Sequence, residues 1–180
     1  PKTLGAVLNF AKLREFLVAE VESYNGKVCM GCRYTRHFQE DGKTIVEVRS
    51  SDGKKFAVST EVLVDATGYA RAVIYDKKSR QPQFLTAVGI EYLIEVELRE
   101  YDKYANDLKF FLGHKWMPKG YSWIFPMEAE KQRLKIGVAR FNLEHKQIVE
   151  TKPMRWYLKL LIQDYMKLEK YKLIDIHGST

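Results

Sequence analysis

The sequence predicts an α+β fold, built from a β-meander and one apolar strand followed by a mostly antiparallel sheet with a packed helix. Three observations support this class. Apolar residues recur at helical spacing over residues 10–24, short strand patterns separated by Asp-Gly turns fill residues 27–64, and four further strand patterns precede a second helical pattern after Pro153. The chain therefore carries two groups of strands, each accompanied by a helix.

The first helix is predicted from an apolar face that begins at Phe10 and ends at Tyr24. Asn9 is a plausible N-cap for this helix. Asn25-Gly26 stops it, with Gly26 available for the left-handed position.

Strands then follow, separated by the turns Asp41-Gly42 and Asp52-Gly53. They are predicted at Lys27–Met30, Arg33–Gln39, Thr44–Arg49 and Lys54–Val58. The last three form a three-stranded antiparallel meander. A further strand is predicted at Glu61–Ala66, where Val62-Leu63-Val64 is apolar on both faces. Such a strand is usually buried inside a sheet.

Residues 75–82 are polar and rich in turn formers, so we place a linker there, between domains at residues 1–74 and 83–180. Four strands are predicted beyond it, at Phe84–Glu100, Leu108–Leu112, Ser122–Phe125 and Leu134–Phe141. Charged residues alternate with apolar ones in the first, which is typical of an antiparallel sheet with one solvated face. A helix begins near Pro153, which suits a first helical turn, and Leu173–Ile176 forms a short final strand.

The composition is that of a globular protein of one domain or parts of two. The chain has 180 residues, of which 46% are hydrophobic and 29% charged, and its formal net charge is +7. A basic excess is compatible with nucleic acid, an anionic membrane surface or a phosphorylated cofactor as a partner. Because the cations are spread along the chain and alternate with carboxylates, we predict a soluble mixed-charge surface rather than a nucleic-acid interface.

The two cysteines are too few for a disulfide framework, so we expect a reducing, cytoplasmic environment. Cys29 and Cys32 form a lone C-x-x-C, which we interpret as structural thiols rather than a redox pair. A zinc site would need two further ligands, and His37 is the only nearby candidate, so no metal is expected. The sequence contains no apolar run of about 18 residues and no recognisable signal peptide.

The first motif with chemical content is Asp65-Ala66-Thr67-Gly68, which ends the predicted apolar strand. Small residues at the carboxyl end of a strand let a ligand lie against the main chain. Gly68 can adopt a positive φ, and Thr67 offers a hydroxyl. Read alone, the segment is better explained as a buried strand followed by a turn than as a ligand site.

The second motif is Gly120-Tyr-Ser-Trp-Ile-Phe-Pro126, followed by Gly137 on the next strand. Tyr121, Trp123 and Phe125 alternate along a strand, so all three should lie on one face. An aromatic wall suits an isoprenoid chain or a flavin ring. The alternative is an aromatic stripe in a core.

Together the two motifs resemble those of FAD-dependent oxidoreductases. Thr60 to Gly68 resembles the second dinucleotide-site signature of two-domain flavoproteins. Arg71, three residues after Gly68, stands where related enzymes often have an arginine. Tyr121 to Pro126 resembles the Tyr-x-Trp-x-Phe-Pro motif of the geranylgeranyl reductase branch of the family that includes lycopene cyclases and aromatic hydroxylases. Ala139 replaces the second glycine of the family's Gly-x-Gly.

The resemblance implies that residues 1–74 are the remainder of an FAD domain and residues 83–180 part of a substrate domain. It implies FAD contacts from Asp65, Ala66, Thr67, Gly68 and Arg71. Substrate contacts are implied for the second motif, at Tyr121, Trp123, Phe125, Pro126 and Gly137. Hydride transfer through the flavin would act on a small apolar substrate, with NAD(P)H as a candidate electron donor.

The chain itself lacks the Gly-x-Gly-x-x-Gly phosphate loop of such enzymes, and it opens in mid-pattern at Pro1. We therefore expect an internal fragment that is inactive and binds FAD weakly when alone. The sequence assigns no general acid or base.

Two other functions remain open. A non-enzymatic module could stack nucleic-acid bases on Tyr121 and Trp123. A lipid carrier could use the helix at Trp156–Leu168 as an interfacial element, and peripheral membrane association is compatible with the flavoenzyme reading as well.

Overall fold

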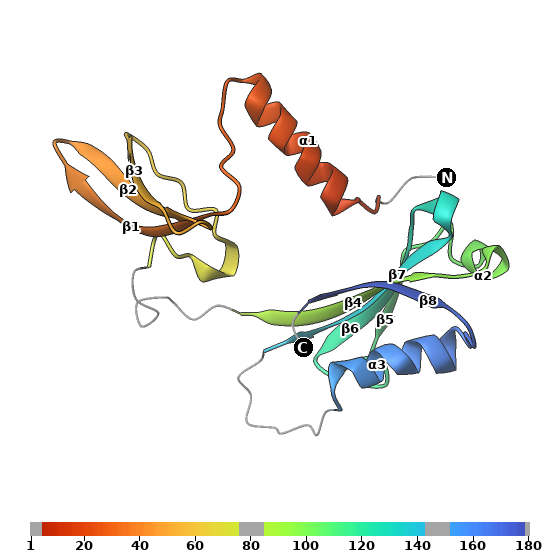
Figure 1. Cartoon of the computed structure of the whole chain (residues 1–180). Helices are drawn as coiled ribbons and strands as arrows, with labels where there is room; N and C mark the ends of the chain where they lie inside the picture. Colours follow the sequence, from red (N-terminus) through yellow and green to blue (C-terminus); the bar gives the residue numbers. More distant parts are fainter. Residues whose placement is uncertain (1–4, 76–84, 143–151, 179–180) are drawn as a thin grey trace. The chain divides into compact units, whose positions relative to one another are not determined.

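The computed structural model describes residues 5–75, 85–142 and 152–178. They belong to two compact units, one formed by Ala11–Gln83 and the other by Pro1–Phe10 together with Phe84–Thr180. Each unit has its own sheet, of three strands in the first and five in the second (Figure 1). This content of helices and antiparallel sheets confirms the predicted α+β class.

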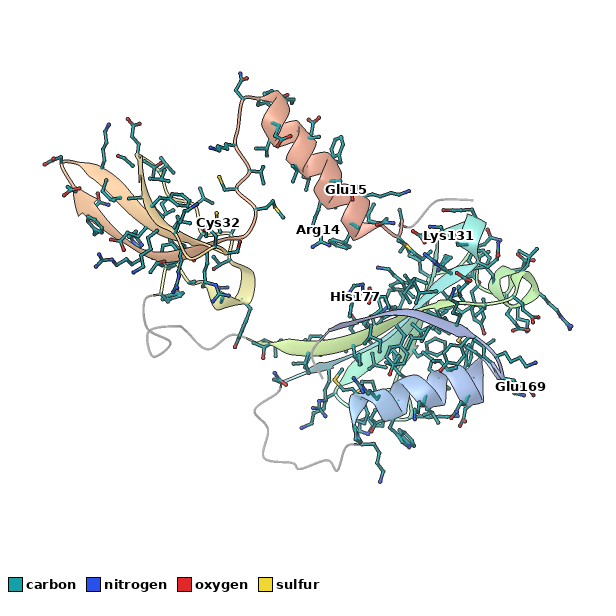
Figure 2. All side chains as sticks on the ribbon, viewed as in Figure 1. Arg14, Glu15, Cys32, Lys131, Glu169 and His177 are labelled. Atoms are coloured by element: carbon teal, nitrogen blue, oxygen red, sulfur yellow. The ribbon has the colours of Figure 1, made fainter. Side chains whose placement is uncertain are left out.

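Helix α1, Phe10–Ser23, is present as predicted, and none of its described residues is buried. The side chains of Arg14 and Glu15 extend outward from it (Figure 2). The helix ends differently from the prediction: the left-handed residue is Asn25, with φ 59°, rather than Gly26. Gly26 is needed for a different reason, because its N–H donates to the Val21 carbonyl and a Cβ there would lie 2.5 Å from Val21 Cγ1.

The predicted meander is confirmed as strands β1, Cys32–Glu40, β2, Lys43–Ser50, and β3, Lys55–Thr60. Both neighbouring pairs are antiparallel. Asp41 and Gly42 have φ values of 48° and 74°, as a two-residue turn of type I′ requires. Thr44 and Val46 are buried on the same face of β2.

Two predicted strands of this unit, Lys27–Met30 and Glu61–Ala66, are wrong. Neither segment is in a strand, and the side chains of Val62 and Val64 are 73% and 75% exposed. Apolar patterning indicates that a segment can be buried, but a strand also needs a neighbour to accept and donate backbone hydrogen bonds. Among the described residues no strand pairs with either segment.

The second unit is a five-stranded antiparallel sheet in the order β5-β6-β7-β4-β8. In chain order its strands are β4, Ala87–Glu95, β5, Lys109–Leu112, β6, Gly120–Met127, β7, Arg133–Phe141, and β8, Lys172–Gly178. Helix α3, Met154–Leu160, continues as the π-helical turn η4, Leu161–Tyr165, and lies across one face of the sheet (Figure 1). A short 3₁₀ turn, η3, Ala129–Lys131, lies between β6 and β7, and another, η1, Gly68–Ala70, belongs to the first unit.

The core of this unit lies between the sheet and α3. Alternate residues of β4, β6 and β7 point into it and meet the buried side of the helix. The residues with at most 2% exposure are Ile90, Ile94, Met117, Ser122, Ile124, Leu134, Ile136, Val138, Leu158, Leu161 and Ile162. Tyr165, the last residue of η4, packs edge-on against Phe111 with ring centroids 4.6 Å apart. The opposite face of the sheet is therefore available to other side chains.

Most predicted elements of this unit are confirmed, namely the strands near 108–112, 122–125, 134–141 and 173–176 and the helix after Pro153. The long strand predicted at Phe84–Glu100 is only partly right. Its pairing ends at Glu95, and Leu98–Asp102 forms helix α2, because the Glu97 carbonyl accepts from the N–H groups of Glu100 and Tyr101. Phe84 and residues 76–82 of the predicted linker lie outside the described residues.

Among the helices of the described residues, none combines the length and the apolar character needed to cross a membrane.

Candidate functional site

The three aromatic residues of β6 lie together on the face of the sheet that α3 does not cover. Tyr121, Trp123 and Phe125 are half-buried, whereas Ser122 and Ile124 between them are fully buried in the core. The ring centroids of Tyr121 and Trp123 are 5.6 Å apart, and those of Trp123 and Phe125 are 6.2 Å apart in a stacked arrangement. The spacing in the sequence thus predicted the shared face correctly.

A fourth ring completes this group. Phe110 of β5 pairs directly with Trp123, is 57% exposed, and packs edge-on against Phe125 at 5.1 Å. It also lies 6.1 Å from the Tyr121 ring. We call the surface formed by Phe110, Tyr121, Trp123 and Phe125 the aromatic face. It is a partly exposed apolar surface on the strands β5 and β6.

The centre of the aromatic face belongs to a row of directly paired residues that runs across all five strands. From β5 to β8 the row reads Phe110, Trp123, Gly137, Glu91 and His177. Figure 2 shows His177 on β8, where its ring also pairs with the Asp175 carboxylate at 2.7 Å. The row therefore changes from apolar at one edge of the sheet to polar at the other.

Gly137 determines how the Trp123 indole lies. A Cβ placed on Gly137 would be 2.0 Å from Trp123 Cζ2 and 2.2 Å from Cε2, so the indole occupies the space of the missing side chain. The indole Nε1–H donates to Glu91 Oε2 at 3.0 Å. Glu91 Oε1 in turn lies 3.3 Å from Lys135 Nζ. Three residues on the two strands β7 and β4 thus hold the Trp123 ring.

Beyond the aromatic face, the charges on this side of the sheet are paired with one another. Arg133 lies 3.2 Å from Glu95 and 2.6 Å from Glu128, and its hydrogen bond lowers the pKa of the Glu128 carboxyl. The Asn9 amide donates to Glu128 at 3.1 Å. Lys131, labelled in Figure 2, lies 3.5 Å from the same carboxylate. The charged side chains beside the aromatic face therefore largely neutralise one another.

Pro126 does not share the aromatic face, although the resemblance grouped it with the substrate contacts. Strand alternation turns it to the opposite side of β6, as for Ser122 and Ile124. There it lines a separate hollow of about 340 Å³ with Tyr101 and Leu108 among other residues. Pro126 therefore lies next to the aromatic face in the chain but is not part of it.

The sequence did not single out Phe110 and Glu91, which the structure adds to the site. Phe110 pairs with β6 only because of the register across the loop between the two strands. Glu91 reaches Trp123 across β7, from a strand that is 32 residues distant in the sequence. The sequence held one signal that could have identified Glu91: the alternation of apolar and charged residues in β4, which places Glu91 on the more polar face.

The second candidate site is the loop that follows β3, in the other unit. Asp65 accepts four hydrogen bonds, from Thr67 N–H at 2.9 Å, from Thr67 Oγ1 at 2.7 Å, and from the N–H groups of Val73 and Ile74 at 3.0 Å each. Thr67 Oγ1 also accepts from Ala72 N–H at 2.8 Å. These bonds hold the pKa of Asp65 at about 2, well below its ordinary value of 3.8.

The loop exposes its main chain at the predicted tripeptide. Ala66, Thr67 and Gly68 are all exposed, and no described atom lies within 4 Å of the position where a Gly68 Cβ would stand. Gly68 has the expected positive φ of 65°, and Arg71 is also left-handed at 42°. The buried strand predicted here is wrong, and the tripeptide lies in an exposed loop instead.

The C-x-x-C pair lies just before and at the start of β1. Cys29 is exposed and Cys32, at the start of β1 in Figure 2, is half-buried, and both thiols are free. Within residues 5–75, 85–142 and 152–178, no three His, Cys, Asp or Glu residues cluster as metal ligands would. Our interpretation of the cysteines as structural thiols stays a prediction.

Solved structures with this arrangement of elements are flavoproteins. A flavoprotein/dehydrogenase from Cytophaga hutchinsonii aligns with a TM-score of 0.64 and 12% identity over 94% of this chain and 43% of its own. Aklavinone-11 hydroxylase, solved with FAD and aklavinone, aligns with a TM-score of 0.61 and 19% identity over 97% of this chain and 32% of its own. The chain therefore shares the fold of one region of these flavoproteins.

The sequence assigns the family more closely. Residues 89–180, which include the whole aromatic face, match the geranylgeranyl reductase catalytic domain, and the chain belongs to that family. Digeranylgeranylglycerophospholipid reductase of Haloferax volcanii is 34% identical over 147 residues, which are 78% of this chain. The chain spans 34% of the length of that relative.

Replacing Gly137 by alanine should destabilise the five-stranded unit by about 1–3 kcal/mol, because the new methyl group and the indole cannot occupy the same space. Urea unfolding measures the effect. Gly89→Ala is the matched control, since its Cβ would meet nothing closer than the Val138 carbonyl at 3.3 Å. Combining Gly137→Ala with Trp123→Ala should relieve the clash, and equal stability of Gly137→Ala and the wild type would contradict this packing.

The Asp65 carboxylate should stabilise its loop at neutral pH and cease to do so in acid. Since its folded pKa of about 2 lies below 3.8, the stabilisation is complete above pH 3.8 and is lost as the pH falls toward 2. Amide exchange protection of Val73 and Ile74, corrected for intrinsic rates, should fall across this window in the wild type. Asp65→Asn should show weaker protection already at neutral pH, and no decline in the wild type would argue against the interaction.

Proposed function

We propose that the chain is part of an FAD-dependent oxidoreductase that acts on an apolar, isoprenoid-containing substrate. The observation that carries this proposal is the aromatic face, four adjoining rings on the sheet face that α3 does not cover, within the residues that match the geranylgeranyl reductase family. Such a surface offers large contact area and no cationic or anionic side chain among its rings. Tyr121, Trp123 and Phe125, with Gly137 beneath, would contact the substrate.

The loop at Asp65 fits an FAD contact. Its tripeptide Ala66-Thr67-Gly68 offers exposed main chain, and the open space at Gly68 lets a flat group approach closely. The Asp65 carboxylate already accepts four hydrogen bonds from the loop. We therefore assign Asp65 the role of holding the loop in shape rather than a direct contact with FAD. Arg71 ends the 3₁₀ turn that begins at Gly68, and its guanidinium would bind the anionic pyrophosphate of FAD. Bound FAD would supply two-electron redox chemistry, with NAD(P)H as the proposed electron donor.

We assign cofactor binding and substrate binding to different compact units. The unit of Ala11–Gln83 would be the remainder of the FAD domain, and residues from Phe84 onward would form part of the substrate domain. The Haloferax volcanii relative, named for a lipid that carries geranylgeranyl chains, supports the choice of an isoprenoid substrate. In the reaction, these residues would bind the isoprenoid chain of the substrate and exclude water from it.

Nucleic-acid binding is less well supported. The side chains next to the aromatic rings include the carboxylates of Glu91, Glu95 and Glu128, which repel phosphates. The cations beside them, Lys135 and Arg133, are already paired with these carboxylates. A sheet that stacks bases usually adds unpaired cations along the backbone path.

We also propose that α3 gives the protein a peripheral contact with anionic membranes. Trp156 is 45% exposed on the outward side of the helix, and Arg155 and Lys159 are exposed on it as well. Aromatic rings beside cations suit the headgroup region of a bilayer.

Neutralising Arg155 or Lys159 with glutamine should weaken binding to phosphatidylglycerol vesicles about fivefold per charge, since each interfacial cation contributes about 1 kcal/mol. Co-sedimentation at constant ionic strength measures this. Lys103→Gln, which removes an exposed cation paired with Glu100 on α2, is the control. Binding that does not depend on these charges would refute the membrane contact without touching the enzymatic proposal.

Flavin content tests the main proposal. The full-length gene product should be yellow when purified and should reduce geranylgeranyl double bonds when a reductant is added. Gly68→Val should lower FAD affinity about tenfold or more, equivalent to ~1.4 kcal/mol, because its side chain covers the exposed main chain. Gly53→Val is a matched control, since Gly53 also has a positive φ and open space around it. A colourless full-length protein that cannot be loaded with FAD would refute the proposal.

A further inference from the structure

The Trp123 ring is held more tightly than an aromatic residue on an exposed surface requires. Below it, the main chain of Gly137 leaves no room for the ring to sink or tilt further, because even a methyl group at this position would overlap it. At its edge, the indole N–H is bound to a carboxylate on a strand that is not adjacent to its own. The neighbouring Tyr121 and Phe125 rings bound it along the strand.

The carboxylate that binds the indole is itself fixed. Glu91 uses one oxygen for the indole N–H and the other for the Lys135 ammonium. Both side chains are mostly buried, with 19% and 16% exposure, so this pair is screened by water less than a surface ion pair. A carboxylate with both oxygens engaged has little freedom to turn, and the ring that it binds loses the same freedom.

The orientation of the ring determines the shape of the aromatic face. An indole that lies against Gly137 continues the surface made by its neighbours, whereas an indole that rotated about χ1 or χ2 into another staggered position would stand out from the sheet. A long apolar chain gains contact with every ring only when the surface is continuous. A short chain needs only part of that surface and loses less when one ring moves.

We propose that Glu91 is a positioning residue of the substrate surface: it holds the Trp123 indole against Gly137, Lys135 holds Glu91, and the arrangement sets the preference for long isoprenoid chains. The inference rests on the proposed function for its substrate, but the positioning of the ring can be measured separately. Glu91 does not touch the substrate. Its effect is exerted through Trp123.

The first experiment observes the ring itself. This 180-residue chain has three tryptophans, so the ¹⁵N-labelled chain shows three indole N–H resonances, and Trp123→Phe identifies the relevant one. In the wild type the Trp123 indole N–H should exchange with solvent at least about tenfold more slowly than that of the exposed Trp156, because it is hydrogen-bonded. Glu91→Leu should abolish the difference, and Glu91→Gln, which keeps an acceptor oxygen, should retain most of it.

Lys135→Met and Glu95→Leu complete the set. Lys135→Met leaves the acceptor but frees it to turn, so the protection of the indole should fall between those of the wild type and Glu91→Leu. Glu95→Leu removes a carboxylate from the same strand and the same face, where it binds Arg133 rather than a ring, and should leave the indole unchanged. Equal effects of Glu91→Leu and Glu95→Leu would overturn the proposal. So would an unprotected Trp123 indole in the wild type, an outcome that does not depend on whether any variant folds.

The second experiment measures chain preference with the full-length, FAD-loaded protein. The probes are geraniol and geranylgeraniol, which differ in the number of isoprene units. Glu91→Leu should lower the affinity for geranylgeraniol about tenfold and that for geraniol about threefold or less, raising KM more than it lowers kcat, and Glu91→Gln should restore the preference. An unchanged ratio of affinities in Glu91→Leu would refute the role in specificity. Failure of the wild type to bind either probe would refute the isoprenoid function, while the indole measurement would still decide the positioning of Trp123.

Discussion

The contact between the Trp123 indole and the main chain of Gly137 is the constraint on which the candidate site depends. It exists because β6 and β7 pair in the register that places these two residues opposite each other, and because residue 137 has no side chain. A shift of one residue would turn every side chain of β6 to the other face. The tryptophan would then enter the core, and Ile124 would face outward. The same register therefore secures both the packing under α3 and the aromatic face above it.

The two sides of this sheet use different physical interactions. Beneath it, fully buried aliphatic residues pack against α3 and stabilise the unit through the removal of apolar surface from water. Above it, aromatic rings and paired charges occupy the surface, and Glu91 connects the two groups through the indole N–H and Lys135. Because the apolar core lies entirely on one side, the other side can be specialised for binding without loss of the interactions that keep the unit folded.

The local pattern of the sequence predicted those features that depend on residues close together in the chain. Alternation placed Tyr121, Trp123 and Phe125 on one face, and two Asp-Gly turns defined the meander. The features that it missed depend on pairing between distant segments. The register that brings Phe110 and Glu91 to Trp123 is not encoded in either strand alone. Residues 62–64 have the apolar character of an interior strand, yet a run of apolar residues does not indicate whether a neighbouring strand is present.

The Asp65 loop has a consequence for how a nucleotide would be recognised there. Its conformation is specified by its own side chains, since the Asp65 carboxylate, just before the exposed tripeptide, accepts from Thr67 within it and from Val73 and Ile74 after it. The conformational entropy of the loop is therefore lost when the protein folds and not when a ligand arrives. A cofactor that meets such a preorganised segment retains the full free energy of its contacts. The segment can then contribute to affinity with little surface of its own.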